Sequence, residues 1–111
     1  SGTAEEILAE MIERRTKLFE RIMPFRIAAD MHSHRSPYLM QERRMMNEGL
    51  CEIMRSALPA AIRKDRVAVD ALDAVLSFDF WRRLRSDQRL SIAQARRGIE
   101  ATAAPLIGVK R

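Results

Sequence analysis

The chain has 111 residues, 47% of them hydrophobic and 32% charged, which excludes a disordered protein and predicts one globular domain with one core. A single cysteine, Cys51, excludes an internal disulfide and favours a reducing, cytoplasmic setting, and the longest uncharged stretch, residues 101–109, is too short to span a membrane. The net charge of +5 permits contact with nucleic acid without demonstrating it, because acidic residues are interleaved with most of the basic ones.

The N-terminal part of the chain predicts a long amphipathic helix. Thr3 and Glu6 have the spacing of a capping box, in which each side chain binds a free main-chain amide. The apolar residues that follow form one stripe at helical spacing: Ile7, Leu8, Met11, Ile12, Leu18, Phe19, Ile22 and Met23. Pro24 removes one main-chain hydrogen bond, so we expect a kink or a restart there. The segment 25–34 is apolar on two sides, which is typical of a segment surrounded by neighbours.

The middle of the chain predicts a second long helix. Ser36 supplies a capping hydroxyl and Pro37 suits the first helical position, so together they form a start signal. The helix is expected to run to about Leu58, with Pro59 helping to end it. Residues 60–66 are expected to form a loop or a short helical turn.

The last third predicts two more helices. One spans residues 67–85 and is capped by Asp65, and the other spans residues 92–107 behind a capping box of Ser91 and Gln94. No stretch alternates polar and apolar residues as a strand would. The fold class predicted is therefore all-α, a bundle of about five helices.

The helix over residues 67–85 carries two apolar faces, and the helix over 92–107 adds small residues away from its main stripe. A domain of this size cannot easily bury both faces itself, so we predict a homodimer through the last two helices. The alternative is that the second face contacts the 60–66 loop. The residues assigned to the interface are Ala71, Ala74, Phe78, Trp81, Gly98, Ala101 and Pro105.

Several methionines and the two-sided segment after Pro24 suggest a pocket for a small ligand. Methionine fills gaps in a core but also suits a deformable pocket wall, and the sequence leaves these two possibilities open. We expect a largely hydrophobic effector that can carry one anionic group, and no cofactor. The residues predicted to line the pocket are Met31, His34, Met46, Leu50, Met54, Leu76 and Phe80.

Two arginines interrupt the apolar stripes of the long helices. Arg15 falls within the first stripe and Arg43 within the next. The favoured interpretation is that both reach water from the edge of a stripe. The alternative is that they are polar anchors in an apolar cavity, where a guanidinium can hold a carboxylate or phosphate.

No pattern in the sequence predicts catalysis or a metal site. His32 and His34 are two residues apart on the expected helix and diverge by about 200°, which is wrong for gripping one metal ion. The chain has no glycine-rich phosphate loop, no signature for a nucleophilic Cys51, and no paired acid and base. We therefore expect neither an enzyme nor a metalloprotein.

Two stretches resemble the C-terminal domain of TetR-family (tetracycline-repressor-like) transcriptional regulators. Arg14 to Pro37 is similar to the family's long kinked helix and the turn after it, and Ala71 to Ala95 is similar to its last two helices and their connecting loop. Most of the match is carried by Phe78, Trp81, Leu84, Arg85, Gln88, Leu90 and Ser91. The resemblance covers nearly the whole chain but contains no short diagnostic motif.

The resemblance implies a homodimer joined by a four-helix bundle of the last two helices, and a small ligand bound within the helical core. It also implies that DNA is bound only by an N-terminal helix-turn-helix domain, which we expect to be missing from this chain. Residues 1–2 (Ser-Gly, with no initiator methionine) are expected to be a cloning remnant, and residues 3–111 the effector-binding and dimerisation domain. We expect no membrane partner.

A rival interpretation is a stand-alone basic helical protein that binds nucleic acid directly. Residues 84–98 can be aligned with a helix-turn-helix, with Arg96 and Arg97 on its second helix. The apolar faces of both helices argue against it, because they are expected to be used in packing.

Overall fold

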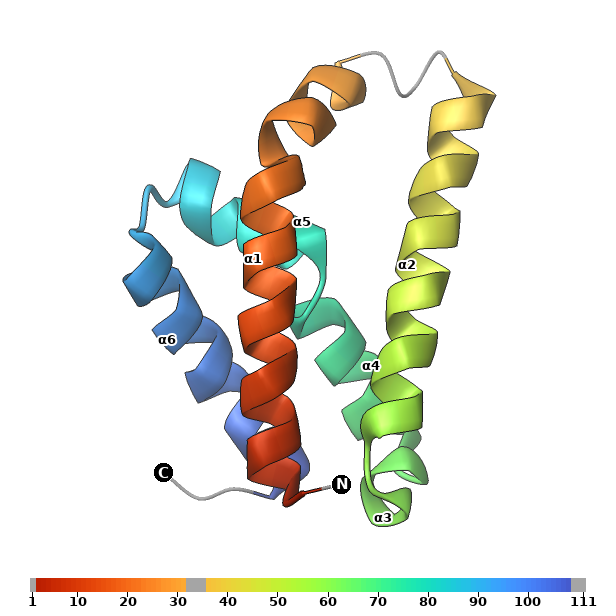
Figure 1. Ribbon diagram of the computed structural model, residues 1–111, viewed down its shortest axis with the longest axis vertical. Helices are drawn as coiled ribbons and strands as arrows, with labels where there is room; N and C mark the ends of the chain where they lie inside the picture. Colours follow the sequence, from red (N-terminus) through yellow and green to blue (C-terminus); the bar gives the residue numbers. More distant parts are fainter. Residues whose placement is uncertain (1, 32–35, 109–111) are drawn as a thin grey trace.

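The computed structural model describes residues 2–31 and 36–108, and within those ranges it is all-helical, with no strand. Figure 1 shows a bundle built around two long helices. The helices in chain order are α1 (Ala4–Asp30), α2 (Pro37–Ala57), α3 (Ala60–Arg63), α4 (Arg66–Val75), α5 (Phe78–Arg82) and α6 (Ile92–Ala103). A π-helical turn (Arg83–Asp87) follows α5, and a 3₁₀ turn (Ala104–Ile107) follows α6. The predicted all-α bundle is confirmed.

Helix α1 lies near the middle of the bundle. It runs antiparallel to α2 on one side and contacts α5 and α6 on the other (Figure 1). Helix α4 completes the arrangement, because it contacts α2, α3, α5 and α6. None of the helices in the described ranges is both long and apolar enough to span a lipid bilayer.

The four predicted helix starts are confirmed. Thr3 caps α1 in a capping box with Glu6, and Ser91 caps α6 in another with Gln94. The Ser36 hydroxyl caps α2 with proline at the first helical position, and the Asp65 carboxylate accepts the Ala68 amide at 3.2 Å to cap α4. Each cap depends only on neighbours in the sequence, which is why local pattern predicts it.

The single helix expected over residues 67–85 is interrupted. It breaks after Val75, where the Ser77 hydroxyl donates to the Ala74 carbonyl at 2.6 Å and accepts the Phe80 amide at 3.2 Å. Ser77 thus ends one helix and caps the next, with Asp79 in the favourable first turn. Apolar residues continue at helical spacing on both sides of Ser77, which is why the sequence pattern predicts one helix here instead of two.

The restart expected at Pro24 does not occur. Helix α1 continues through the proline to Asp30, and Met31 is its C-terminal cap. Side-chain contacts hold these last turns in place: the Arg26 guanidinium lies over the Phe78 ring, 4.6 Å from its centroid, and Asp30 pairs with Arg82 of α5. Packing on α5 thus stabilises helical turns that a proline would otherwise interrupt.

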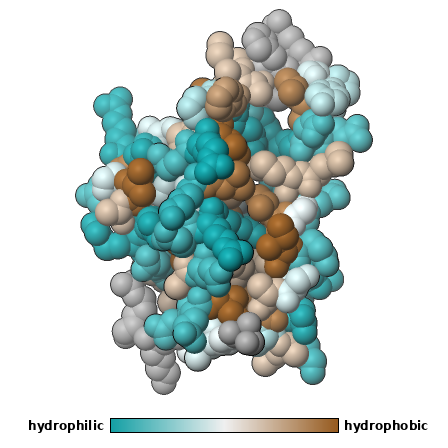
Figure 2. Space-filling model, viewed as in Figure 1, coloured by the Kyte–Doolittle hydropathy of each residue, from teal (hydrophilic) through white to brown (hydrophobic). Residues whose placement is uncertain are grey.

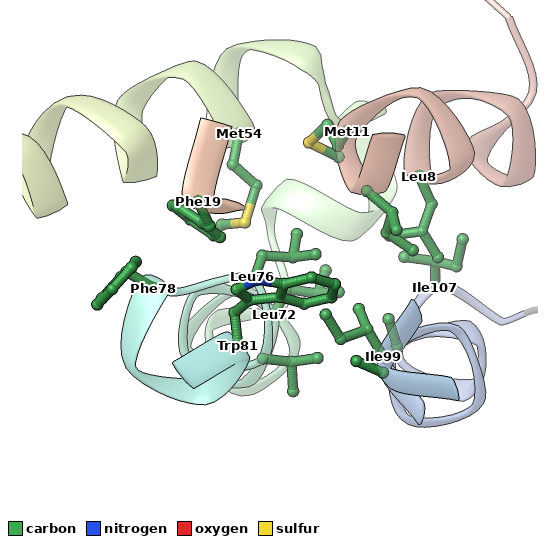
Figure 3. Close-up of a cluster of buried hydrophobic side chains, with 14 of the residues drawn as sticks. Leu8, Met11, Phe19, Met54, Leu72, Leu76, Phe78, Trp81, Ile99 and Ile107 are labelled. Atoms are coloured by element: carbon green, nitrogen blue, oxygen red, sulfur yellow. The ribbon is translucent and has the colours of Figure 1, made fainter. Parts of the chain in front are cut away.

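The core lies mainly between α1, α4, α5 and α6, with Met54 of α2 packed into it and Trp81 in its midst (Figure 3). Trp81 is 0% exposed, and its indole Nε1 donates to the Glu20 carboxylate at 2.8 Å. Phe19 and Phe78 meet edge to face, with ring centroids 5.6 Å apart. Glu20 also accepts two hydrogen bonds of 2.9 Å from Arg85, which lower the pKa of its carboxyl group.

Candidate functional site

The residues predicted to line one pocket are distributed between the core and the surface. Met54 is 0% and Leu76 2% exposed, and Phe80 packs against the same core. Met31, at 70% exposed, lies on the surface. Such fully packed side chains leave no space beside them for a ligand, so Met54 and Leu76 are corrected from pocket wall to core. His34 lies outside the described residues.

The other two predicted lining residues, Met46 and Leu50, belong to two separate grooves between α1 and α2. Both grooves are open to solvent. Figure 2 shows apolar side chains in a broken strip down the middle of this face, with hydrophilic residues on either side.

The larger hollow, here called the Arg15 groove, has a volume of about 550 Å³ and lies between the N-terminal half of α1 and the C-terminal half of α2. Six of its lining residues are apolar: Ile7, Met11, Leu18, Leu50, Ile53 and Ala57. Glu10, Arg14, Arg15 and Ser56 supply the polar part of the wall. A mainly apolar wall with a few polar groups is the usual composition of a small-molecule site.

Arg15 is buried rather than extended to water, so the favoured sequence interpretation is wrong for this residue. Its side chain donates to the Leu76 carbonyl at 3.1 Å and to the Leu50 carbonyl. Leu76 is the C-terminal cap of α4, where main-chain carbonyls lack helical donors. Arg15 therefore joins three helices through main-chain oxygens.

The charge of Arg15 is only partly compensated. Burial lowers the pKa of its guanidinium, and the charge of the nearby Asp73 carboxylate acts in the opposite direction. The Cys51 thiol has a raised pKa, chiefly because it is partly buried and close to Asp73. A raised pKa keeps this cysteine in its unreactive thiol form at neutral pH.

The smaller hollow, here called the Arg43 groove, has a volume of about 380 Å³ and lies between the last turns of α1 and the first turns of α2. Its apolar wall is made by Ala29, Leu39 and Met46. Its polar wall is made by Arg26, Asp30, Glu42 and Arg43. Arg43 pairs with Asp30 and is about one-third exposed, so it lies at the edge of the hollow as a partly accessible charge.

Phe78 and Trp81, two of the residues predicted at a dimer interface, are buried by their own chain. They are 1% and 0% exposed, so no surface remains on them for a partner to cover, and their assignment is corrected to the core. The small residues are more accessible: Ala71, Gly98 and Ala101 are partly buried, and Ala74 and Pro105 are exposed. A Cβ added at Gly98 would lie 3.9 Å from Leu84, an ordinary contact within the chain.

The described residues contain no group of three or more His, Cys, Asp or Glu side chains placed to hold a metal ion. His32, like His34, lies outside those residues.

No family model, no curated protein and no solved structure matches this chain.

Proposed function

We propose that this chain is the effector-sensing and dimerisation domain of a TetR-type transcriptional regulator. A small ligand bound between its helices would modulate DNA binding by an N-terminal helix-turn-helix domain that is not part of this sequence. The observation that carries the proposal is the Arg15 groove, whose volume of about 550 Å³ lies in the usual range for small-molecule sites. Its composition favours a hydrophobic effector with one anionic group.

The groove is placed where a ligand can affect the position of a whole helix. Helix α2 has only one fully buried residue, Met54, among its 21 residues. The Leu50 carbonyl of α2 is bound by Arg15, so an anionic ligand near Arg15 would compete with that hydrogen bond. If the ligand binds one position of α2 more tightly than another, its binding shifts the population of the domain toward that position.

Thermal unfolding with decanoate and decanol tests the effector site. We expect decanoate to raise the melting temperature more than decanol, and a ligand at a hundredfold excess over its Kd adds about 2.7 kcal/mol of stability. Ile53→Glu, on the groove wall, should abolish the effect because it places a negative charge beside the ligand. Met45→Glu is the control, since Met45 is another exposed apolar residue of α2. Equal loss of the effect in both variants would count against the Arg15 groove.

Dimerisation is the second half of the proposal. Ala101 and Pro105 are small or compact residues that would let the backbone of a partner approach closely. Light scattering is expected to give twice the chain mass of 12.8 kDa at micromolar concentration. Ala101→Arg should shift the protein toward monomer, and Ala93→Arg, at an exposed position about two turns earlier in α6, should not. A wild-type mass of one chain would contradict this half of the proposal.

The rival function, direct binding of nucleic acid, has less support. Arg96, one of the two arginines it requires, pairs with Glu13 of α1, and Ala95 and Ile99 of the same helix are buried. These contacts hold α6 against the bundle. Salt-dependent retardation of random duplex DNA by this chain would revive the rival function.

A further inference from the structure

Three arginines converge on one carboxylate at the end of α1. Asp30 pairs with Arg43 of α2 and Arg82 of α5, and its Oδ1 lies 3.5 Å from Nε of Arg26, one turn earlier in α1. The cluster therefore brings together side chains from three helices beside the Arg43 groove. Asp30 is only 16% exposed, so these charges meet in a partly desolvated place.

Three guanidinium groups, those of Arg26, Arg43 and Arg82, lie around the carboxylates of Asp30 and Asp79. Asp79 adds a contact of 3.9 Å with Arg26, but its side chain is 68% exposed and therefore well screened by solvent. Burial lowers the pKa of Arg26, and the charges of Arg43 and Arg82 lower it further. The Asp79 carboxylate acts in the opposite direction but does not reverse the shift.

Several guanidinium N–H groups of the cluster are buried without a hydrogen bond. Among the described residues, Nε and Nη2 of Arg26 and Nε of Arg43 have no hydrogen-bond acceptor. Buried donors in folded proteins are almost always satisfied, so unpaired ones suggest a missing acceptor. The face of the Arg26 guanidinium lies over the Phe78 ring, so an acceptor can approach only its edge, where Nε and Nη2 are buried.

The adjacent groove has room for such an acceptor and for an apolar body attached to it. Arg26 and Arg43 lie on its wall together with Leu39 and Met46. Glu42 is the one further carboxylate of the wall besides Asp30, and it is exposed and interacts with the Tyr38 hydroxyl, whose pKa it raises. A carboxylate at this edge disfavours ions that carry several negative charges.

We propose that the Arg43 groove is a second binding site, separate from the Arg15 groove, for a small organic oxyanion with an apolar body. Asp30 and Asp79 lie near Arg26 without forming a hydrogen bond to its Nε or Nη2, and a carboxylate or a phosphate monoester would bring acceptor oxygens within hydrogen-bond distance of these groups and of Arg43 Nε. Planar guanidinium groups suit this class because they bind two oxygens of one head group at once. The apolar body lies against Leu39 and Met46.

The Nε–Hε signals of arginine in ¹H–¹⁵N NMR spectra report this site directly. Sodium benzoate, phenyl phosphate and inorganic phosphate are added separately to the full chain, with sodium chloride of equal ionic strength as the reference. Benzoate or phenyl phosphate is expected to shift the Arg26 and Arg43 signals saturably, whereas the signal of the exposed Arg44 follows the chloride reference. Whichever of benzoate and phenyl phosphate binds more tightly identifies the head group.

Arg43→Gln should weaken binding of the better probe at least tenfold, and Arg44→Gln, with the same change in net charge, should leave it unchanged. Glu42→Gln should strengthen it. Ile53→Glu, in the Arg15 groove, should have no effect, so this test is independent of the proposed effector site. Shifts of Arg26 and Arg43 no larger than that of Arg44, or equal weakening by the two arginine variants, would overturn the proposal. Inorganic phosphate binding as tightly as phenyl phosphate would overturn the role of the apolar wall.

Discussion

Helices α1 and α2 are both long and lie side by side, but only one of them is built into the core. Helix α1 buries six residues between Leu8 and Phe19, whereas α2 fully buries only Met54. The difference arises because α1 is covered by α5 and α6 on the side away from α2, while α2 has neighbours on fewer sides (Figure 1). A helix attached by few buried contacts opens at lower free energy, so both grooves lie beside the more easily displaced helix.

The largest expected effect tests the well-packed side of this comparison. Trp81→Ala removes the largest buried side chain and should lower the free energy of unfolding by about 3–5 kcal/mol. Phe25→Ala, at an exposed aromatic residue of α1, should change it by no more than about 0.5 kcal/mol. Urea denaturation measures both. Similar losses in the two variants would mean that the core is not centred on Trp81.

The next effect concerns the attachment of α2. Arg15→Met keeps most of the apolar stem but removes the donor of the Leu76 carbonyl at the end of α4 and the additional donor of the Leu50 carbonyl in α2, which should cost about 2 kcal/mol. Hydrogen exchange should also speed up more in α2 than in α6. Arg14→Met is the matched control, because Arg14 pairs with Glu10 at the exposed surface. If the Arg15 variant is as stable as the control, the two hydrogen bonds do not stabilise the packing of α2 on the rest of the bundle.

A smaller effect should appear at acid pH, on the α5 side of α1. Arg85 lowers the folded-state pKa of Glu20 below its ordinary value of 4.5. The contribution of Glu20 to stability is therefore present above its unfolded-state pKa and is lost as the pH falls through the lower folded-state pKa. Glu20→Gln should flatten the loss of stability below about pH 4.5, and Glu52→Gln, on the exposed surface of α2, should not. Parallel acid unfolding curves for wild type and Glu20→Gln would refute this assignment.

The smallest effect tests whether the low helix propensity of a glycine in α2 reduces the stability of the protein. Gly49 is an exposed residue in α2 with no atom within 4 Å of an added Cβ, so Gly49→Ala should raise stability by about 0.5–1 kcal/mol. Gly108→Ala should instead lower it, because Gly108 has a φ of +82° that alanine adopts with strain. Thermal unfolding distinguishes these opposite signs, and destabilisation by Gly49→Ala would show that α2 is packed there.

Local chemistry determined where most helices begin. Thr3, Ser36, Asp65 and Ser91 each satisfy amides three residues away, so neighbours in the sequence are enough to predict them. Ser77 does the same between α4 and α5. The apolar pattern, however, continues on both sides of Ser77 and predicts one helix there.

Tertiary contacts decided which apolar face meets which neighbour, and helical periodicity carries no information on that choice. The spacing of Phe78 and Trp81 predicts a surface for a partner chain, yet α1 and its Glu20 cover both residues within one chain. The sequence favours an Arg15 that reaches water from the edge of an apolar stripe. Its burial is possible because it donates to two carbonyls that are distant in sequence. The arginine cluster around Asp30 joins residues 52 positions apart, from Asp30 to Arg82. The sequence by itself determined the helices and their caps, because those depend on residues within one turn. The structure alone decided the partners of Trp81, Arg15 and Asp30, because those partners are brought close only by folding.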